Sequence, residues 1–524
     1  MRPKLALSTD TSSANGFDRH WRAVLMITMA LTAVRMVALF ATPLELYPDE
    51  AQYWLWSRTL DWGYYSKPPV VAWLIWATTS IGGDAEPWVR FSAPLLHAIT
   101  TFCVYGIGRR LYGPSTGFAA AALYLLMPAV QLSSVVAATD APLLMFLSLA
   151  LLAYVELPAG DHRRRLWLAA GFGAATGLAF LSKYAAVYGL IGLALHLALS
   201  KPARTVWTLK SAGLAALAFL VILAPNLAWN AAHGFSTVQH TAANAAWGGR
   251  QLFNFGELGE FLASQFGVFG PIPFAVLIGG AAVLAARRRL EPADVLLLCF
   301  ALPAVLIVTG QAFISRANAN WSGAGYAPGV ILAAAWLVRW RARWWLMGAL
   351  ALQAAVAAVF LACVLQPSFA ETIGLSNAFK RAKGWEQMTE AMANRALREP
   401  PKSLSAVAVN DRFLFNAAAY YGRDYFGRNG EPPLKMWVRE AHPQNQAETV
   451  APLTAADGGR VLAVSLEQVF IEEMKADFRA TSDEEIVSIR LDNKRKRKAE
   501  LFIAEGFDPA PRDPVTGKPI PRRP

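Results

Sequence analysis

Cysteine and acidic side chains are scarce in this 524-residue sequence. Its three cysteines, Cys103, Cys299 and Cys363, each lie inside an apolar run, where a cysteine behaves as a small buried hydrophobic residue. This placement excludes a disulfide framework or a cysteine metal cluster as the basis of the fold. Charged residues make up only 16% of the chain, with 37 acidic against 49 basic side chains.

Hydrophobic residues are abundant and make up 55% of the sequence. That share exceeds what a water-soluble chain needs for its core and indicates an integral membrane protein. The formal net charge of +12 could suggest nucleic acid as a partner. The surplus sits in short clusters between hydrophobic segments, where membrane topology places it, so we expect membrane lipids and no nucleic acid.

The first 365 residues divide into about eleven candidate spanning helices, since each span needs roughly 20 predominantly apolar residues. No small-residue cleavage site follows the first apolar run, which is therefore expected to be a retained helix. The predicted ranges are 22–42, 89–108, 114–131, 140–158, 166–182, 184–200, 211–226, 266–286, 293–311, 324–338 and 344–365.

Five basic clusters orient these helices, because all five fall on every second connection. Connections rich in Lys and Arg stay in the cytoplasm. We therefore expect a cytoplasmic N-terminus in a bacterial inner membrane, with the remaining connections on the periplasmic side. The clusters are Arg109-Arg110, Arg163 to Arg165, Lys201 with Arg204 and Lys210, Arg287 to Arg289, and Arg339 with Arg341 and Arg343.

The character of the chain changes after Pro367, where apolar runs shorten and charges intersperse. Segments 403–409, 460–466 and 499–505 resemble strands between helical stretches. The prediction is an all-α polytopic membrane domain over 1–365 and a periplasmic mixed α/β domain over 366–507. Residues 508–524 are rich in proline and polar residues, and we expect a flexible tail there.

The first periplasmic connection, 43–88, is long enough to suggest a function, and it is rich in aromatic residues. We expect short helices along the outer membrane surface. The aromatic residues taken singly are typical of an interfacial belt, although Tyr64 and Tyr65 are also candidates for substrate binding. The stretch YPDEAQYW places Asp49 and Glu50 directly after the first helix. Carboxylates at that depth need a cation, a metal ion or a substrate, or else they simply begin a solvated loop.

Further charged residues belong to the same predicted face. Asp140 stands at a helix start, where capping and catalysis are equally good explanations. Lys67 and Lys183 could be interfacial anchors. Together with Arg35 and Arg316, however, they could supply the cations that a phosphate-bearing lipid requires. Asn320, which follows Arg316 in AFISRANANW, is a candidate for the same phosphate or its sugar.

In this order the motifs resemble the GT-C glycosyltransferases that use polyprenyl-phosphate sugars, including protein O-mannosyltransferases and the aminoarabinose transferase of lipid A. The resemblance rests on the Asp-Glu pair after the first helix, a Lys-Pro-Pro loop, an Asp at the fourth helix and a Lys between the fifth and sixth. It covers the whole membrane region.

The resemblance implies direct transfer of a sugar from a lipid phosphate to an acceptor at the outer face. Asp49 then matches the catalytic carboxylate, with Glu50 in support and Asp140 as a second acid. Lys67 and Lys183 match cations of the donor-phosphate pocket. His233 resembles a metal-binding histidine, but Ser66 stands where the partner glutamate is expected, so a divalent metal ion is the one cofactor left open.

The expected reaction is a single inverting displacement from a polyprenyl-phosphate-linked sugar to lipid A or its core, another glycan or a protein. A carboxylate base and cations for the leaving phosphate would serve it. Two alternatives stay open at this stage. One is a flippase or transporter of lipid-linked sugars, and the other is a ligase that joins larger lipid-linked glycans to lipid A.

Overall fold

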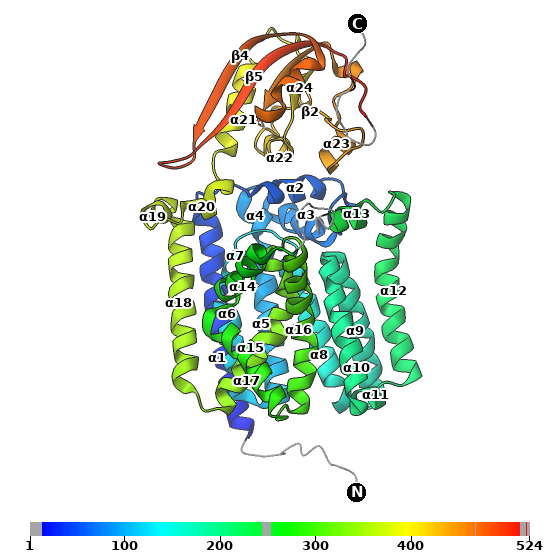
Figure 1. Ribbon diagram of the computed structural model, residues 1–524, viewed down its shortest axis with the longest axis vertical. Helices are drawn as coiled ribbons and strands as arrows, with labels where there is room; N and C mark the ends of the chain where they lie inside the picture. Colours follow the sequence, from blue (N-terminus) through cyan, green and yellow to red (C-terminus); the bar gives the residue numbers. More distant parts are fainter. Residues whose placement is uncertain (1–12, 244–252, 467, 514–519, 521–524) are drawn as a thin grey trace. The chain divides into compact units, whose positions relative to one another are not determined.

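The computed structural model describes residues 13–243, 253–466, 468–513 and 520, and the chain forms two compact units. The first unit contains Met1–Leu39, Phe91–Phe235 and Thr241–Leu361, and the second contains Phe40–Arg90, Ser236–His240 and Ala362–Pro524. The colours of Figure 1 follow the chain through both units. The long first connection therefore folds with the C-terminal region. Part of the predicted tail, 514–519 and 521–524, lies outside the described residues.

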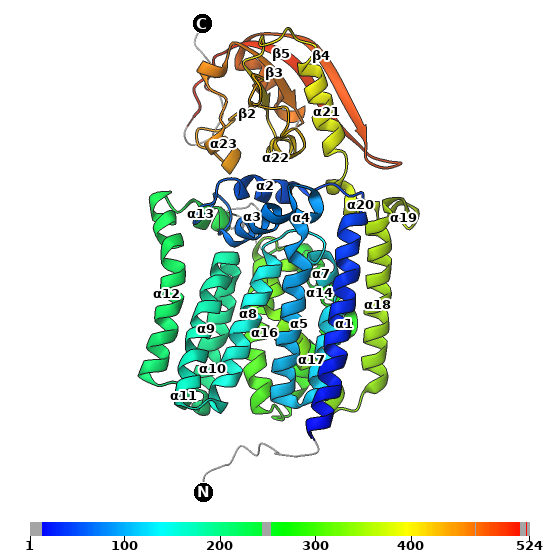
Figure 2. The same ribbon diagram turned by 180° about the vertical axis from the view of Figure 1, so that it is seen from behind.

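The first unit is a bundle of helices, most of which run side by side in Figures 1 and 2. Its helices are α1 (Ser13–Ala41), α5 (Ser92–Tyr112), α6 (Pro114–Leu126), α7 (Pro128–Ser133), α8 (Asp140–Glu156), α9 (His162–Ser182), α10 (Val187–Leu199), α11 (Lys201–Val206), α12 (Leu209–Ala232), α14 (Phe255–Phe269), α15 (Pro271–Ala286), α16 (Pro292–Ile314), α17 (Tyr326–Arg339) and α18 (Arg343–Leu365).

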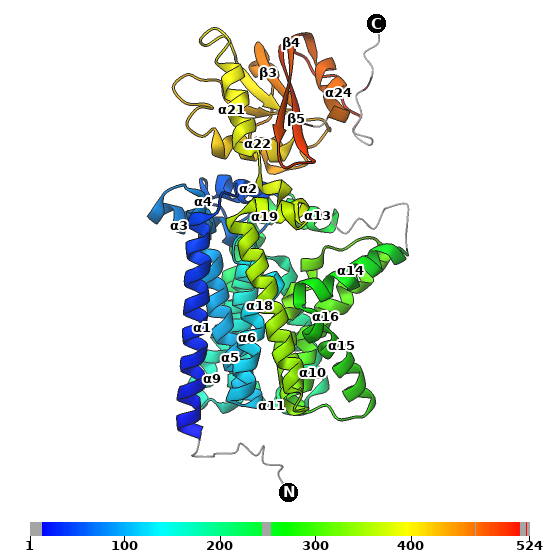
Figure 3. The ribbon, with the colours of Figure 1, turned by 90° about the vertical axis from the view of Figure 1, so that its left-hand side faces the viewer.

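Each of the eleven predicted ranges coincides with helical structure, but the count of eleven spans is not confirmed. Among the described residues, eight helices are long and apolar enough to cross a membrane, or nine if the pair α14 and α15 is one span. That pair bends by 116° at Gly270, whose φ of 103° favours glycine. Figure 3 shows the two helices diverging. The protein is therefore a multi-pass membrane protein.

Two predicted spans are shorter than expected. The 114–131 range is broken after Leu126, because Pro128 follows and the residue before a proline avoids helical geometry. The 184–200 range begins with the 3-10 turn Tyr184–Ala186 before α10. Both remain apolar helices of the bundle.

Close contact between α9 and α12 depends on glycine. A Cβ atom at Gly173 would lie 2.0 Å from the carbonyl oxygen of Ala215, so a larger residue would push the helices apart. Small residues at such crossings are typical of membrane helices, which associate through close packing.

The buried carboxylate of Asp294 joins three helices of the same unit. It accepts hydrogen bonds from Tyr112 of α5 and from Trp336 and Arg339 of α17. Asp294 itself lies in the first turn of α16. A fully buried charge is tolerated here because its partners satisfy it.

A five-stranded sheet forms the centre of the second unit, as expected for a mixed α/β domain. The strands are β1 (Ala406–Val409), β2 (Leu434–Met436), β3 (Arg460–Ser465), β4 (Phe478–Arg490) and β5 (Lys496–Phe507), in the order β2-β1-β3-β5-β4. The first three are parallel, while β5 pairs antiparallel with β3 and β4. Strands β1, β3 and β5 overlap the three strand-like segments of the sequence.

Alternating residues cover the two faces of this sheet. Val407, Leu462 and Leu501 pack on one face with α21 (Trp385–Ala396) and α22 (Arg412–Tyr421). Val461 and Phe502 pack on the other face with α24 (Ile471–Ala476). The remaining helices of this region are α19 (Pro367–Thr372), α20 (Ser376–Phe379) and α23 (Gln446–Val450).

The first connection supplies the short helices α2 (Pro48–Ser57), α3 (Val70–Gly82) and α4 (Glu86–Arg90). Leu55 of α2 packs against the hydrophobic core that α21 and α22 form with the sheet. The segment that carries Asp49 and Glu50 is thus part of the same unit as the C-terminal domain. A fourth short helix, α13 (Ser236–Ala243), begins in this unit.

Candidate functional site

In the first unit, three of the predicted residues come together at one end of the bundle. The ammonium group of Lys183 donates to Asp140 Oδ1 at 2.8 Å, and the amide of Asn320 donates to Asp140 Oδ2 at 3.2 Å. The Lys183 and Asp140 side chains are each 19% exposed. Because the pair is only partly buried, a substrate can reach it.

Local structure explains how these side chains converge. Asp140 is the first residue of α8, whose N-cap is Thr139, and the Asp140 carboxylate binds the side chains of Lys183 and Asn320 and no backbone N–H of the helix. Lys183 ends α9 in an extended conformation, and Asn320 belongs to the 3-10 turn Ala319–Gly325. Of the two explanations for Asp140, capping is therefore not what the structure contains.

A second polar group fixes the turn that carries Asn320. Gln265 of α14 accepts hydrogen bonds from Ser322 at 2.8 Å and from Tyr326 at 2.9 Å, and it donates to the Ala319 carbonyl at 3.0 Å. Gln265 and Tyr326 were not predicted from the sequence, since single polar residues in apolar helices have no spacing signal.

Two predicted cations of this unit lie outside the Asp140 cluster. Arg35 is 3% exposed, and it donates to the Leu125 carbonyl at 2.7 Å and to Gln131 at 3.1 Å, beside the break between α6 and α7. The side chain of Arg316 is exposed. A phosphate-binding role for either residue stays a prediction.

In the second unit, Asp49 and Glu50 have different surroundings although they are adjacent. Glu50 is fully buried, and Arg90 binds it through two hydrogen bonds of 2.9 Å. Glu50 also accepts from the backbone N–H of Tyr47 at 2.8 Å. Asp49 is half-buried, and its side chain forms no hydrogen bond or ion pair with any residue that the structure describes.

The Lys67 loop of the same unit packs against α13. Thr237 donates to the carbonyl of Tyr64 at 2.7 Å, and the ring of Tyr65 packs edge-on against His240 at 5.8 Å. Burial raises the pKa of Tyr64 to about 12. Burial, with the positive charges of Lys67 and Arg412, lowers the pKa of His240 to about 4, so this imidazole is neutral near pH 7.

The residues around His233 do not fit a metal ion. Its Nδ1 donates to the carbonyl of Trp229 at 2.8 Å, and its ring stacks on the indole of the same residue. Within the described parts of the chain, no three His, Cys, Asp or Glu side chains are arranged to hold a metal. We derive no step through a metal.

Residues 66–229 match a family model described as dolichyl-phosphate-mannose-protein mannosyltransferase. Over 318 residues the chain is 39% identical to the lipid A galacturonosyltransferase RgtD of Rhizobium johnstonii. That alignment covers 60% of this chain and 66% of the relative, slightly less than two thirds.

Solved structures share the fold. ArnT from Cupriavidus metallidurans bound to undecaprenyl phosphate has a TM-score of 0.63 at 17% identity, covering 91% of this chain and 97% of that one. The Archaeoglobus fulgidus oligosaccharyltransferase has a TM-score of 0.51 at 14% identity, covering 86% of this chain and 69% of that one. The predicted fold, a helical membrane domain followed by a small α/β domain, is therefore confirmed.

Proposed function

We propose that this chain is an integral membrane glycosyltransferase of the GT-C type. Support comes from the match of residues 66–229 to the dolichyl-phosphate-mannose-protein mannosyltransferase model and from the fold shared with ArnT. The enzyme moves a sugar from a polyprenyl-phosphate donor to an envelope acceptor. The observation that carries the proposal is the partly exposed cluster of Asp140, Lys183 and Asn320 at the end of an apolar bundle. Ionisable side chains within a membrane bundle pair with one another or face a substrate path, and they therefore mark a candidate site.

Lipid A is the acceptor that we propose first, because the relative with 39% identity is named a lipid A galacturonosyltransferase. A galacturonosyl polyprenyl phosphate is the matching donor. Other glycans and proteins are acceptors that the same chemistry would serve.

Asp49 is the general base of the proposed reaction. Its half-buried carboxylate has no fixed partner among the described residues, so it can accept the proton of an acceptor hydroxyl. General-base help of this kind contributes about 10²–10⁴-fold. The acceptor oxygen bonds to the anomeric carbon while the bond to phosphate breaks, and the leaving polyprenyl phosphate keeps the electron pair. The configuration at the anomeric carbon is inverted.

Lys183 is the cation that we assign to the leaving phosphate in the first unit. Its ion pair with Asp140 holds the ammonium group in place, and Asn320 holds the other oxygen of that carboxylate. Electrostatic stabilisation of developing charge is usually the largest catalytic contribution. Glu50 is buried against Arg90, so we propose a structural role for it and not a direct one.

A cavity of about 420 Å³ between α9, α10 and α12 is a candidate for the prenyl chain of the donor. Its lining is mostly apolar and includes Gly173, Thr176, Leu193, Ala216 and Phe219. The volume lies within the range of about 300–1,000 Å³ that is usual for ligand pockets.

The bacterial inner membrane is the proposed location, with a cytoplasmic N-terminus and a periplasmic site and C-terminal domain. Support comes from the five basic clusters on alternate connections.

Mass spectrometry of lipid A, core oligosaccharide and envelope glycoproteins tests the function. Cells would carry the wild-type chain, Asp49→Asn or no copy. We expect one defined sugar to disappear from lipid A in both mutant backgrounds while the variant stays in the membrane. Unchanged fractions, together with a lipid-linked sugar that fails to cross the membrane, would instead establish a transporter.

A further inference from the structure

The segment Leu44–Tyr47, which leads into α2, has no regular structure but is firmly held. The backbone N–H of Glu45 donates to the carbonyl of Ala382 at 3.1 Å. The Glu45 carboxylate accepts hydrogen bonds from the backbone N–H groups of Gly384, at 2.9 Å, and Trp385. These two amides form the N-terminus of α21, where the helix dipole favours a negative charge.

Tyr421, at the end of α22, holds the next residue of the segment. Its hydroxyl accepts from the backbone N–H of Leu46 at 2.7 Å and donates to the carboxylate of Glu86. Arg90 completes the arrangement by donating to the carbonyls of Leu44, at 3.0 Å, and Glu45, at 2.7 Å. Four backbone groups and the Glu45 carboxylate are thus bound just before α2 begins.

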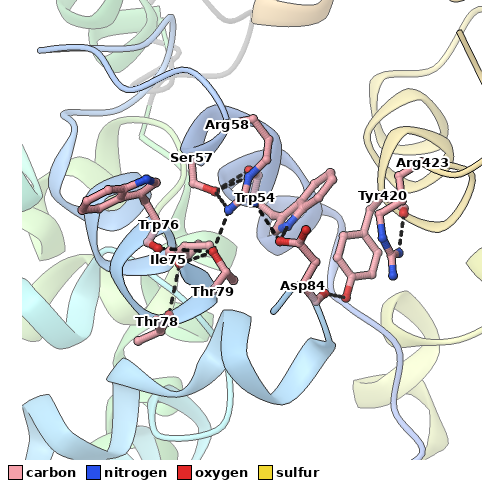
Figure 4. Close-up of polar contacts among 10 residues, drawn as sticks. All are labelled: Trp54, Ser57, Arg58, Ile75, Trp76, Thr78, Thr79, Asp84, Tyr420 and Arg423. Atoms are coloured by element: carbon pink, nitrogen blue, oxygen red, sulfur yellow. Dashed lines mark hydrogen bonds and ion pairs between the residues drawn. The ribbon is translucent and has the colours of Figure 1, made fainter. Parts of the chain in front are cut away.

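The far end of α2 is held by a separate set of contacts, shown in Figure 4. Trp54 packs edge-on against the ring of Tyr420 at 4.9 Å, and its indole N–H donates to Asp84 at 2.9 Å. The Tyr420 hydroxyl donates to the Asp84 carbonyl at 2.6 Å. Arg58 binds Asp84 at 2.8 Å and Thr79 at 2.6 Å.

Between these attachments α2 has little freedom to rotate or slide. Eight of its ten residues are buried, and the two that are not are Asp49 and Leu55. Leu55 packs against the core of the C-terminal domain. Asp49 is therefore the one acidic side chain that this otherwise buried helix presents at its surface.

We propose that the C-terminal domain positions Asp49: Tyr421 and the N-terminus of α21 fix the start of α2, and Tyr420 fixes its end. This inference rests on the proposed function, because it takes Asp49 as the general base. Tyr421, Tyr420 and Glu45 are positioning residues. Displacement of a catalytic group by about 1 Å can cost roughly 10²-fold in rate.

The experiment compares the full-length enzyme with Tyr421→Phe, which keeps the ring and removes only the hydroxyl. We expect kcat to fall about 10- to 100-fold while KM for donor and acceptor changes less than about twofold, since the substrate contacts remain. Tyr425→Phe is the matched control, because Tyr425 lies just after the end of α22 but interacts with Glu431. It should retain the wild-type kcat.

A double variant distinguishes a positioning role of Tyr421 from a loss of activity that is independent of Asp49. If Tyr421 acts through Asp49, adding Tyr421→Phe to Asp49→Asn lowers the residual rate no further. An equal loss in both backgrounds, or a wild-type kcat in Tyr421→Phe, would overturn the proposal. Tyr420→Phe provides a second variant that should behave in the same way as Tyr421→Phe.

Hydrogen exchange tests the positioning role of Tyr421 separately from the proposed role of Asp49 as the general base. We expect faster amide exchange over α2 in Tyr421→Phe than in Tyr425→Phe. Unchanged exchange would refute the positioning role whatever the activity. An Asp49→Asn enzyme as active as wild type would refute the proposed function, while faster exchange would still support the mechanical attachment.

Discussion

The ion pair of Glu50 and Arg90 should be the most sensitive polar contact of the second unit. Both side chains are almost completely buried, at 0% and 3% exposure, and two hydrogen bonds of 2.9 Å join them. Removing one partner leaves the other charge buried and unpaired, which lowers the free energy of unfolding by about 3–5 kcal/mol. For a unit of 150–250 residues, 1 kcal/mol shifts Tm by about 2–4 °C, so Glu50→Gln or Arg90→Met should lower Tm by about 6–20 °C.

A double-mutant cycle on the full-length protein in detergent tests this reasoning. The double variant should be no less stable than the worse single variant, because no unpaired charge remains. Thermal unfolding gives the stabilities, and transfer rates are measured well below each Tm. If Glu50→Gln has the same Tm as the wild type but no longer transfers the sugar, Glu50 takes part directly in catalysis and the structural role is refuted.

Three further predictions concern other groups. Asp294→Asn should destabilise the first unit by about 3 kcal/mol, because a neutral amide cannot accept all the hydrogen bonds that Tyr112 and Arg339 donate to this fully buried carboxylate, and thermal unfolding would detect this. Lys183→Met should lower the initial transfer rate at saturating donor by about 10²–10³-fold, the usual cost of removing one electrostatic stabiliser. The low pKa of His240, about 4 against 6.5 for an exposed imidazole, means that the unfolded chain takes up this proton first. The stability that neutral His240 contributes is therefore complete above pH 6.5 and is lost as the pH falls towards 4. Tm should change less with pH between 4 and 6.5 in His240→Gln than in the wild type.

Each of these predictions has a control and a contradicting result. Asp161→Asn, at an exposed helix cap, should cost no more than about 2 kcal/mol, so an equal effect from Asp294→Asn would contradict the buried network. Lys201→Met changes an exposed lysine and should leave transfer intact. A Tm profile that is the same for His240→Gln and wild type between pH 4 and 6.5 would exclude the histidine as the cause.

The membrane domain was predictable because apolar length and basic connections are local properties of the sequence. The residues of each predicted span do form helices, yet the sequence did not reveal how Gly270 and Pro271 bend one of them. The strands beginning at Ala406 and Arg460 were likewise visible as short apolar runs.

Pairings between distant residues were not predictable in the same way. The sequence placed Asp140 and Lys183 on one face, but it could not indicate that they form an ion pair. Arg90 and Tyr421 were missed altogether, since their roles depend on partners 40 and 375 residues away. For that reason Glu50 was predicted to support the catalytic carboxylate of Asp49, whereas its buried contact with Arg90 favours a structural role.

Sugar transfer by the purified full-length protein in liposomes would test the proposed reaction. A radiolabelled galacturonosyl polyprenyl phosphate would be the donor and lipid A the acceptor, and the anomeric configuration of the product would be assigned by NMR. We expect an inverted glycoside and free polyprenyl phosphate from the wild type. We also expect a loss of about 10²–10⁴-fold in Asp49→Asn and little change in Asp424→Asn, whose side chain is exposed. A retained configuration, or an Asp49→Asn enzyme as fast as wild type, would contradict the proposed reaction.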